Sequence, residues 1–272
     1  MKFAFTTLGC PDWTVEQVAA AARKYGYDGV ELRLIDGQVI TPELIRAARP
    51  RIEQHLLGAG IAVSSLATSA SFSTGDESRR QENVAAAAEL AALAASLDCR
   101  LIRVFGGKCP DGVDLEAGAS NVAAGLNALA SEVERHGVIA MLETHDDFCD
   151  AGVVASIMAR VPSPAIGVHW DIQNTFKMGA DPARSWQLLG DRIVHVHIKD
   201  ARRGDEPWTR VLLGEGDVPW QDALRVLVGH GYAGYLCVEF EKKWYPNQPD
   251  PDVALPQYSA GLQGFLATLG GA

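Results

Sequence analysis

The chain has 272 residues, of which 47% are hydrophobic and 21% are charged, and its formal net charge is −10. This length and balance are typical of one globular α/β unit, so we expect a single domain over residues 1–272. The acidic surface disfavours nucleic acid as a partner, and the chain lacks the ~20 consecutive apolar residues of a membrane span.

Eight short runs rich in apolar and β-branched residues predict strands. In chain order they cover residues 3–9, 29–34, 62–68, 100–107, 138–145, 166–172, 193–200 and 234–241. Stretches rich in Ala and Leu follow them and predict helices over residues 15–26, 42–60, 81–97, 119–137, 153–161, 182–190, 220–231 and 257–270. Strands that alternate with helices in this way indicate βαβ units and a parallel sheet.

Eight such units in 272 residues leave about 34 residues for each, which is what a closed barrel needs. We therefore expect the α/β fold class, as a (β/α)8 TIM barrel. An open doubly wound sheet is the alternative, but no GxGxxG motif follows the first predicted strand. The five cysteines include no CxxC pair, which is typical of reduced thiols, and the short apolar run at the N-terminus is broken by Pro11, so we expect a cytoplasmic protein.

Acids and imidazoles occupy the inner face of the last four predicted strands. Side chains alternate along a strand, and the apolar residues at every second position should face the helices. The inward positions are then Glu143 and His145, His169 and Asp171, His195, His197 and Lys199, and Glu239 and Glu241. A barrel interior is normally filled with branched apolar side chains, and burying an unpaired charge costs several kcal/mol.

A divalent cation would remove this conflict, with Glu143, Asp171, His197 and Glu239 as its ligands. These residues lie near the C-terminal ends of their strands, where barrel enzymes place their active sites. A single inward acid is explained more simply by a structural salt bridge, but four equivalent positions together favour a metal. Three carboxylates and one imidazole suit Mn²⁺, Mg²⁺ or Zn²⁺, and we favour Mn²⁺.

Other inward or nearby polar residues have two interpretations. His195 and His169 either support the metal ligands from behind or pack in the core, and we assign them the supporting role. Glu31, Arg33 and Arg103 either contact the substrate or form a buried ion-pair network. The segment from Ala201 to Asp217 contains Arg202, Arg203 and Arg210, and it is either an anion-binding loop or a solvated lid. The residues expected to bind substrate are Glu31, Arg103, His145, Asn174, Lys199 and Arg203.

Five segments resemble the xylose isomerase-like barrel superfamily: LETHDDF from Leu142, GVHWDIQNT from Gly167, HVHIKDA from His195, LGEGDVPW from Leu213 and GYLCVEFE from Gly234. This superfamily contains sugar and sugar-phosphate isomerases and epimerases, inosose and dehydroshikimate dehydratases, hydroxypyruvate isomerases and abasic-site endonucleases. The resemblance matches Glu143, Asp171, His197 and Glu239 to the shared metal ligands. It also matches the two glutamates to the proton-transferring pair of the ketose epimerases.

The resemblance reaches two further positions. Arg203, six residues after His197, falls where the ketose epimerases have a substrate-binding arginine. Asn174 departs from the pattern, because the ketose 3-epimerases and the endonucleases carry a histidine three residues after the aspartate of the sixth strand. This departure counts against a strict 3-epimerase and against an endonuclease.

We therefore expect an isomerase or epimerase of a sugar, sugar phosphate or related polyhydroxy carbonyl compound. Glu143 and Glu239 would transfer a proton through an enediolate, with one divalent metal ion as Lewis acid. A dehydratase that begins with the same proton abstraction is the alternative. A phosphodiesterase acting on damaged DNA is disfavoured by the net charge of −10 and by Asn174. A small polyhydroxy molecule is the expected partner, and the sequence leaves homo-oligomerisation open.

Overall fold

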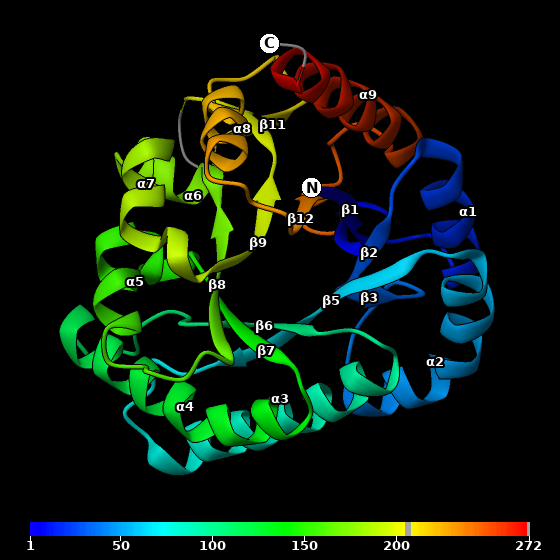
Figure 1. The fold of residues 1–272 in the computed structure, drawn as a ribbon. Helices are drawn as coiled ribbons and strands as arrows, with labels where there is room; N and C mark the ends of the chain where they lie inside the picture. Colours follow the sequence, from blue (N-terminus) through cyan, green and yellow to red (C-terminus); the bar gives the residue numbers. More distant parts are fainter. Residues whose placement is uncertain (205–207, 271–272) are drawn as a thin grey trace.

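A computed structural model describes residues 1–204 and 208–270. Eight parallel strands close into a barrel in the order β1-β12-β9-β8-β7-β6-β5-β2. The barrel closes because β1 pairs with both β2 and β12. The helices form an outer ring around the strands (Figure 1). The predicted (β/α)8 TIM barrel is confirmed.

The strands of the barrel are β1 (Lys2–Thr6), β2 (Gly29–Leu32), β5 (Ala62–Ser71), β6 (Leu101–Phe105), β7 (Ile139–Glu143), β8 (Ile166–Asp171), β9 (Ile193–Ile198) and β12 (Tyr235–Val238). The helices are α1 (Val15–Tyr25), α2 (Pro42–His55), α3 (Glu77–Ser96), α4 (Leu115–Arg135), α5 (Ala151–Met158), α6 (Ile172–Lys177), α7 (Pro182–Leu189), α8 (Trp220–Gly229) and α9 (Pro251–Gly270). Two small hairpins lie outside the barrel: β3 (Leu34–Ile35) with β4 (Gln38–Val39), and β10 (Asp200–Arg202) with β11 (Thr209–Val211).

All eight predicted strands occur, but most end earlier than predicted. The strand expected over residues 166–172 ends at Asp171, whose Oδ1 accepts a hydrogen bond from the backbone N–H of Asn174 (2.9 Å). Asp171 thereby caps the short helix α6, which the sequence analysis missed. The apolar alternation runs on through Ile172, so the pattern alone could not mark this end.

Two helices begin four residues earlier than their apolar periodicity predicts. Helix α3 begins after Asp76 and helix α4 after Asp114, and each aspartate accepts a hydrogen bond from the backbone three residues on, at Arg79 and Ala117. A capping aspartate lowers the cost of the first helical turn, so the polar residues that follow it are helical too.

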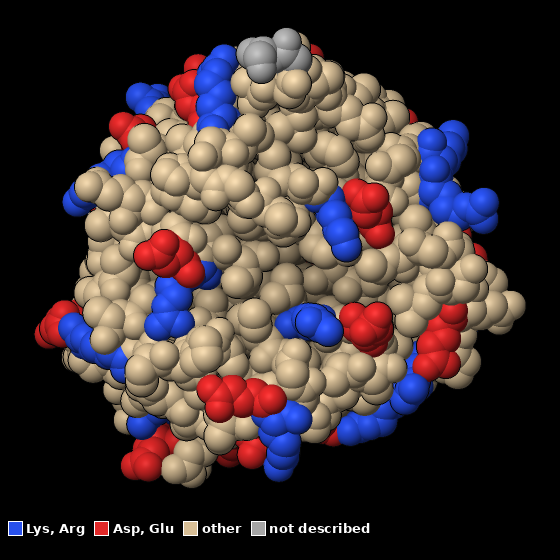
Figure 2. Space-filling model, in the orientation of Figure 1, with Lys and Arg blue, Asp and Glu red and all other residues tan. Residues whose placement is uncertain are grey.

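The outward-facing residues of the strands pack against the helices and form the core. Val196, Ile198, Leu236 and Val238 are each 0% exposed, as expected for the face between strands and helices. The interior of the barrel is polar instead. Among the described residues, no helix combines the length and apolar character needed to cross a bilayer. Basic and acidic side chains are interspersed over the face drawn in Figure 2, which shows no large patch of one sign.

Candidate metal centre and cavity

The four predicted metal ligands meet inside the barrel. Glu143 ends β7, Asp171 ends β8, His197 lies in β9 and Glu239 directly follows β12. The pairing of β8 with β9 sets Asp171 beside His197. Each residue offers one ligand atom within 4.8 Å of the other three, and none of the four is more than 5% exposed. The structure thus brings together all four residues as candidate ligands.

The donor atoms of this cluster fit a divalent cation. Glu143 Oε1 and His197 Nδ1 are buried and have no hydrogen-bond partner among the described residues. His197 Nδ1 lies 3.3 Å from Glu143 Oε1 and 3.3 Å from Glu239 Oε1, so these atoms converge. Buried polar atoms normally have partners, and a cation at the point of convergence would supply one. Two cationic side chains, Arg103 and Lys199, pair with the three carboxylates.

Lys199, which we expected to contact the substrate, lies within the ligand cluster. Its Nζ is 2.7 Å from Asp171 Oδ2 and also contacts Glu239, and the side chain is 2% exposed. Burial lowers the pKa of this amine, but the charges of Asp171 and Glu239 outweigh burial and hold its pKa well above the usual range. Lys199 is therefore a fixed positive charge beside two candidate metal ligands.

Both candidate catalytic glutamates are ionised at neutral pH. Arg103 Nη1 donates a hydrogen bond to Glu143 Oε2 (2.5 Å), and the Arg103 guanidinium also lies over the Phe105 ring. Burial raises the pKa of Glu143, but the Arg103 charge, the contact with His197 and the nearby histidines together outweigh it and hold the pKa well below the usual range. The pKa of Glu239 is also lowered, because the charges of His197 and Lys199 outweigh burial.

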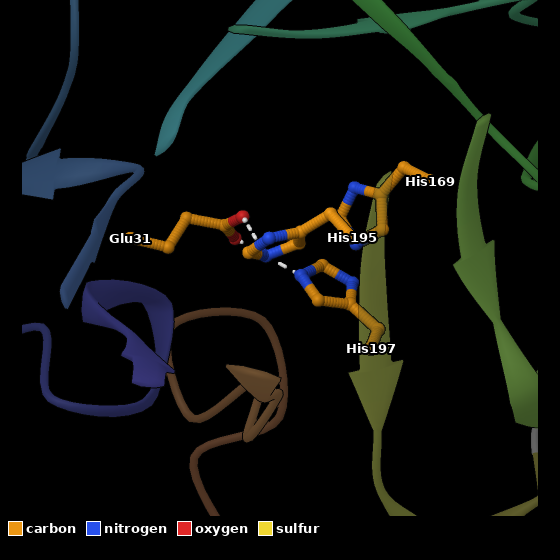
Figure 3. Close-up of side chains that lie close together, drawn as sticks. All are labelled: Glu31, His169, His195 and His197. Atoms are coloured by element: carbon orange, nitrogen blue, oxygen red, sulfur yellow. Dashed lines mark hydrogen bonds and ion pairs between the residues drawn. The ribbon is translucent and has the colours of Figure 1, made fainter. Parts of the chain in front are cut away.

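Glu31, His169 and His195 gather around His197 (Figure 3). Glu31 Oε1 is 3.0 Å from His197 Nε2, and Glu31 Oε2 accepts a hydrogen bond from Ser65 Oγ (2.6 Å) and lies 3.4 Å from His195 Nε2. The His169 ring packs against the His197 ring, with centroids 3.8 Å apart. A carboxylate on the second ring nitrogen of a metal-ligating histidine is a recurrent arrangement that fixes the ring and its tautomer.

These neighbours set opposite protonation states for the histidines. Burial lowers the pKa of His197, but the charges of Glu239 and Glu31 outweigh it and raise that pKa well above its usual value. Burial lowers the pKa of both His169 and His195, which are therefore neutral. Glu31, His169, His195 and His197 also have ligand atoms within 4.8 Å of one another.

A cavity of about 660 Å³ opens over the cluster. Four of the residues expected to bind substrate line it with Glu239: Glu31, Arg103, His145 and Asn174. The Asn174 side chain already makes one hydrogen bond within the protein, from its Nδ2 to the backbone oxygen of Thr144 (2.9 Å). His145 Nδ1 lies 3.1 Å from Asp146 Oδ2, and although burial opposes it, this contact raises the pKa of His145.

Arg203 does not reach the cavity. Its side chain is exposed, and its guanidinium lies over the rings of Phe176 and Trp208, 5.5 and 5.2 Å from their centroids. Arg210 of the same segment lines the cavity instead, with Nε 2.7 Å from Glu241 Oε2. The predicted loop or lid over residues 201–217 contains the hairpin β10–β11, and residues 205–207 lie outside the described residues.

Sequence reasoning missed cavity residues that come from loops. Lys108, Cys149, Trp244 and Tyr245 all line the cavity, but none belongs to an alternating pattern that could predict its direction. The one usable signal was the aromatic pair Trp244 and Tyr245, directly after the last barrel strand, where active-site loops of barrels lie.

Comparisons with known proteins agree with the fold. The family model described as "Xylose isomerase-like TIM barrel" matches residues 19–260. Fructoselysine 3-epimerase from Escherichia coli O157:H7 is 31% identical over 134 residues, which cover 47% of this chain and 47% of that protein, so the chain aligns with about half the length of this relative. L-ribulose 3-epimerase from Methylomonas sp. (strain DH-1) is 27% identical over 246 residues, which cover 84% of this chain and 80% of that protein.

Solved structures share the fold over nearly the whole chain. The IOLI protein, solved with a zinc atom, has a TM-score of 0.80 at 19% identity and covers 96% of each chain. At this identity the likeness concerns the fold alone. The family model, in contrast, spans most of the sequence. The chain therefore belongs to the xylose isomerase-like TIM barrel family.

Proposed function

We propose that the protein is a divalent-metal-dependent isomerase or epimerase of a sugar or a related polyhydroxy carbonyl compound. One observation carries this proposal: Glu143 at the end of β7 and Glu239 just after β12 approach the same imidazole nitrogen, His197 Nδ1, and Glu239 lines the cavity above. The relatives named fructoselysine 3-epimerase and L-ribulose 3-epimerase support a sugar as substrate.

In this proposal Glu143, Asp171, His197 and Glu239 hold the metal ion. When bound, the ion acts as a Lewis acid that polarises the carbonyl group of the substrate. Carboxylate-rich ligand sets suit Mn²⁺ or Mg²⁺, and we favour Mn²⁺; the zinc atom of the IOLI protein makes Zn²⁺ the main alternative.

The protein's own residues then move the proton. Glu143 and Glu239 are both carboxylates at neutral pH, so either can remove a proton from the carbon next to the carbonyl, and the other, once protonated, can return one. Arg103 and Lys199 hold positive charge against these glutamates throughout. Fixed charges of this kind stabilise the negative charge that develops on the substrate, without reorganisation at the moment of reaction.

A dehydratase is the second candidate, because it starts with the same proton abstraction. The observation that favours it is the ammonium group of Lys199, which contacts Glu239 at the floor of the site. A fixed positive charge there would stabilise the negative charge that develops before a hydroxyl group leaves. Dehydration would release water and change the mass of the product, whereas isomerisation would not.

The proposal is tested by Glu143→Gln and Glu239→Gln in a screen of ketoses and aldoses with Mn²⁺-loaded protein. A carboxamide keeps the shape but loses the basicity, so we expect each variant to lose turnover by about 10²-fold to 10⁴-fold while remaining folded. Glu77→Gln, an exposed position on α3, is the matched control and should keep full activity. Near-wild-type turnover in either site variant would assign the proton transfer to other residues.

A further inference from the structure

A second hollow adjoins the cavity over the metal centre. It has a volume of about 350 Å³, and three of its lining residues, Arg210, Trp244 and Tyr245, also line the larger cavity. The two spaces are therefore neighbours across shared side chains. Pockets of about 300–1,000 Å³ hold ligands of drug size, and a monosaccharide is smaller than such a ligand. The larger cavity could accommodate a monosaccharide, which leaves the hollow without an assigned occupant.

Trp244 offers this hollow a bare aromatic surface. It is 51% exposed, whereas the other two aromatic residues of the lining, Trp208 and Tyr245, each pack against another side chain. Trp208 packs edge-on against Phe176, and the Tyr245 ring lies under the guanidinium of Arg210, 4.1 Å from its centroid. An exposed apolar ring at the edge of a polar cavity marks a binding surface, and the C–H face of a pyranose ring stacks well on such a ring.

Gln248 adds an unused hydrogen-bond donor to the same lining. It is 7% exposed, and its Oε1 accepts a hydrogen bond from the backbone N–H of Glu241 (3.0 Å). That bond fixes the orientation of the amide, and Nε2 has no hydrogen-bond partner among the described residues. A buried donor without a partner is unusual, and a hydroxyl oxygen of a ligand would satisfy it.

Among the described residues that line the hollow, no cation is unpaired. Both Nε and Nη2 of Arg210 donate to Glu241 Oε2, at 2.7 and 2.6 Å. Glu241 therefore neutralises the charge of Arg210, so this arginine does not require a phosphate or carboxylate group on the ligand. An apolar ring surface, a hydrogen-bond donor and balanced charge together describe a site for a neutral polyhydroxy ring.

The segment that carries Trp244 is held in place before any ligand binds. The backbone N–H groups of Trp244 and Tyr245 both donate to the backbone oxygen of Glu241 at 2.9 Å. Lys242 Nζ donates to the backbone oxygen of Gln248 (2.9 Å) and closes the turn. A preformed surface loses little entropy on binding, which favours a specific subsite.

We propose that this hollow binds a second sugar ring of the substrate, so that the enzyme acts on a glycoside or disaccharide whose reacting sugar lies over the metal centre. The proposal rests on the proposed function, because it takes the larger cavity as the site of the reacting sugar. Trp244 stacks on the second ring, and Gln248 donates a hydrogen bond to one of its hydroxyl groups.

Calorimetric titration of the Mn²⁺-loaded protein tests this subsite with defined sugars. The probes are D-fructose and three glucosyl-fructoses linked through O3, O5 and O6 of fructose: turanose, leucrose and isomaltulose. We expect at least one disaccharide to bind about threefold to tenfold more tightly than fructose, the range of one favourable ring contact. Because Trp244 lines both spaces, Trp244→Ala should remove the advantage of the disaccharide over fructose, whatever it does to the affinity for fructose itself. Trp244→Phe should keep most of the advantage, and Val253→Ala, an exposed apolar position on α9, should keep all of it.

The outcomes separate this inference from the proposed function. Fructose binding without an advantage for any disaccharide would overturn the subsite alone. An equal loss of fructose and disaccharide affinity in Trp244→Ala would leave the disaccharide advantage intact and would also overturn the subsite. An advantage for 6-O-benzyl-D-fructose but for no disaccharide would make the hollow an aryl site. Failure of every sugar to bind would overturn the proposed function as well.

Discussion

At the scale of single residues, His197 connects the two halves of the site. Its Nδ1 faces Glu143 and Glu239, and its Nε2 faces Glu31. Without metal, these acids favour the imidazolium form and raise the pKa of His197 well above its usual value. A metal ion at Nδ1 must displace the proton on that nitrogen, since only a neutral imidazole can be a ligand.

Metal binding should therefore release about one proton per chain at pH 7. Glu143 and Glu239 contribute none, because their lowered pKa values leave both ionised already. Burial raises the pKa of Asp171, so a proton held on that ligand adds to the release. Affinity should accordingly rise with pH until the pKa of metal-free His197 is passed. The stability of the metal-free fold changes with pH in the opposite direction. The raised pKa of His197 stabilises this fold fully below pH ~6.5, and the contribution is lost as pH rises. Calorimetric titration with the metal in two buffers of different protonation enthalpy measures the number of protons released. A number near zero would show that the metal does not bind at His197 Nδ1.

Glu31 should act through His197. Glu31→Gln keeps the size of the side chain but removes the charge that orients the ring, so we expect metal affinity to fall about 10-fold to 100-fold with the fold retained. A competition titration with a chelating dye measures this. Glu43→Gln, an exposed glutamate on α2, is the matched control. Unchanged affinity in Glu31→Gln would favour the earlier interpretation of Glu31 as a substrate contact.

The sequence could predict the inward direction of these residues but not their pairing. Side-chain alternation along the predicted strand over residues 193–200 is enough to predict that His195, His197 and Lys199 point inward. Whether Lys199 would contact substrate or metal ligands depends on how far its side chain bends toward β8 and β12, which no pattern records. Arg203 is the converse case: its distance from His197 in the sequence suggested the cavity, but its guanidinium packs on Phe176 and Trp208.

At the scale of elements, the segment after β9 is held together by one carboxylate. Asp200 is 1% exposed, and its two oxygens accept hydrogen bonds from the backbone N–H groups of Gly214 (2.8 Å), Gly216 (3.0 Å) and Val218 (3.3 Å). A Cβ on Gly216 would lie 2.2 Å from Asp200 Oδ1, so the close approach requires glycine there. The sequence analysis recognised LGEGDVPW as a family motif, and the structure gives its physical reason.

Asp200→Ala should lower the free energy of unfolding by about 1–3 kcal/mol, because it leaves three backbone donors, one in a buried and two in partly buried hydrogen bonds, without this partner. Urea denaturation followed by circular dichroism measures the change. Asp191→Ala, at an exposed position before β9, removes the same atoms without buried partners and should have little effect. Equal stability of the two variants would show that solvent replaces Asp200 in the segment.

At the scale of the whole molecule, repetition made the fold predictable. Eight alternating units of similar length closely define a closed barrel, and the C-terminal ends of the strands define where chemistry is placed. The cavity walls were less predictable. Trp244, Tyr245 and Lys108 come from irregular loops, whose conformation depends on hydrogen bonds such as those to the Glu241 backbone rather than on periodicity.

The central claim is that carboxylates of this barrel transfer a carbon-bound proton of a metal-polarised sugar. The most direct test incubates the Mn²⁺-loaded protein with its substrate in deuterium oxide and follows the carbon positions by NMR and mass spectrometry. A proton held on Glu143 or Glu239 can exchange with solvent, so deuterium should appear on the carbon next to the carbonyl with no loss of mass as water, and Glu143→Gln and Glu239→Gln should abolish the labelling. Turnover without any carbon-bound deuterium would contradict the account, because the hydrogen would then move without visiting a carboxylate.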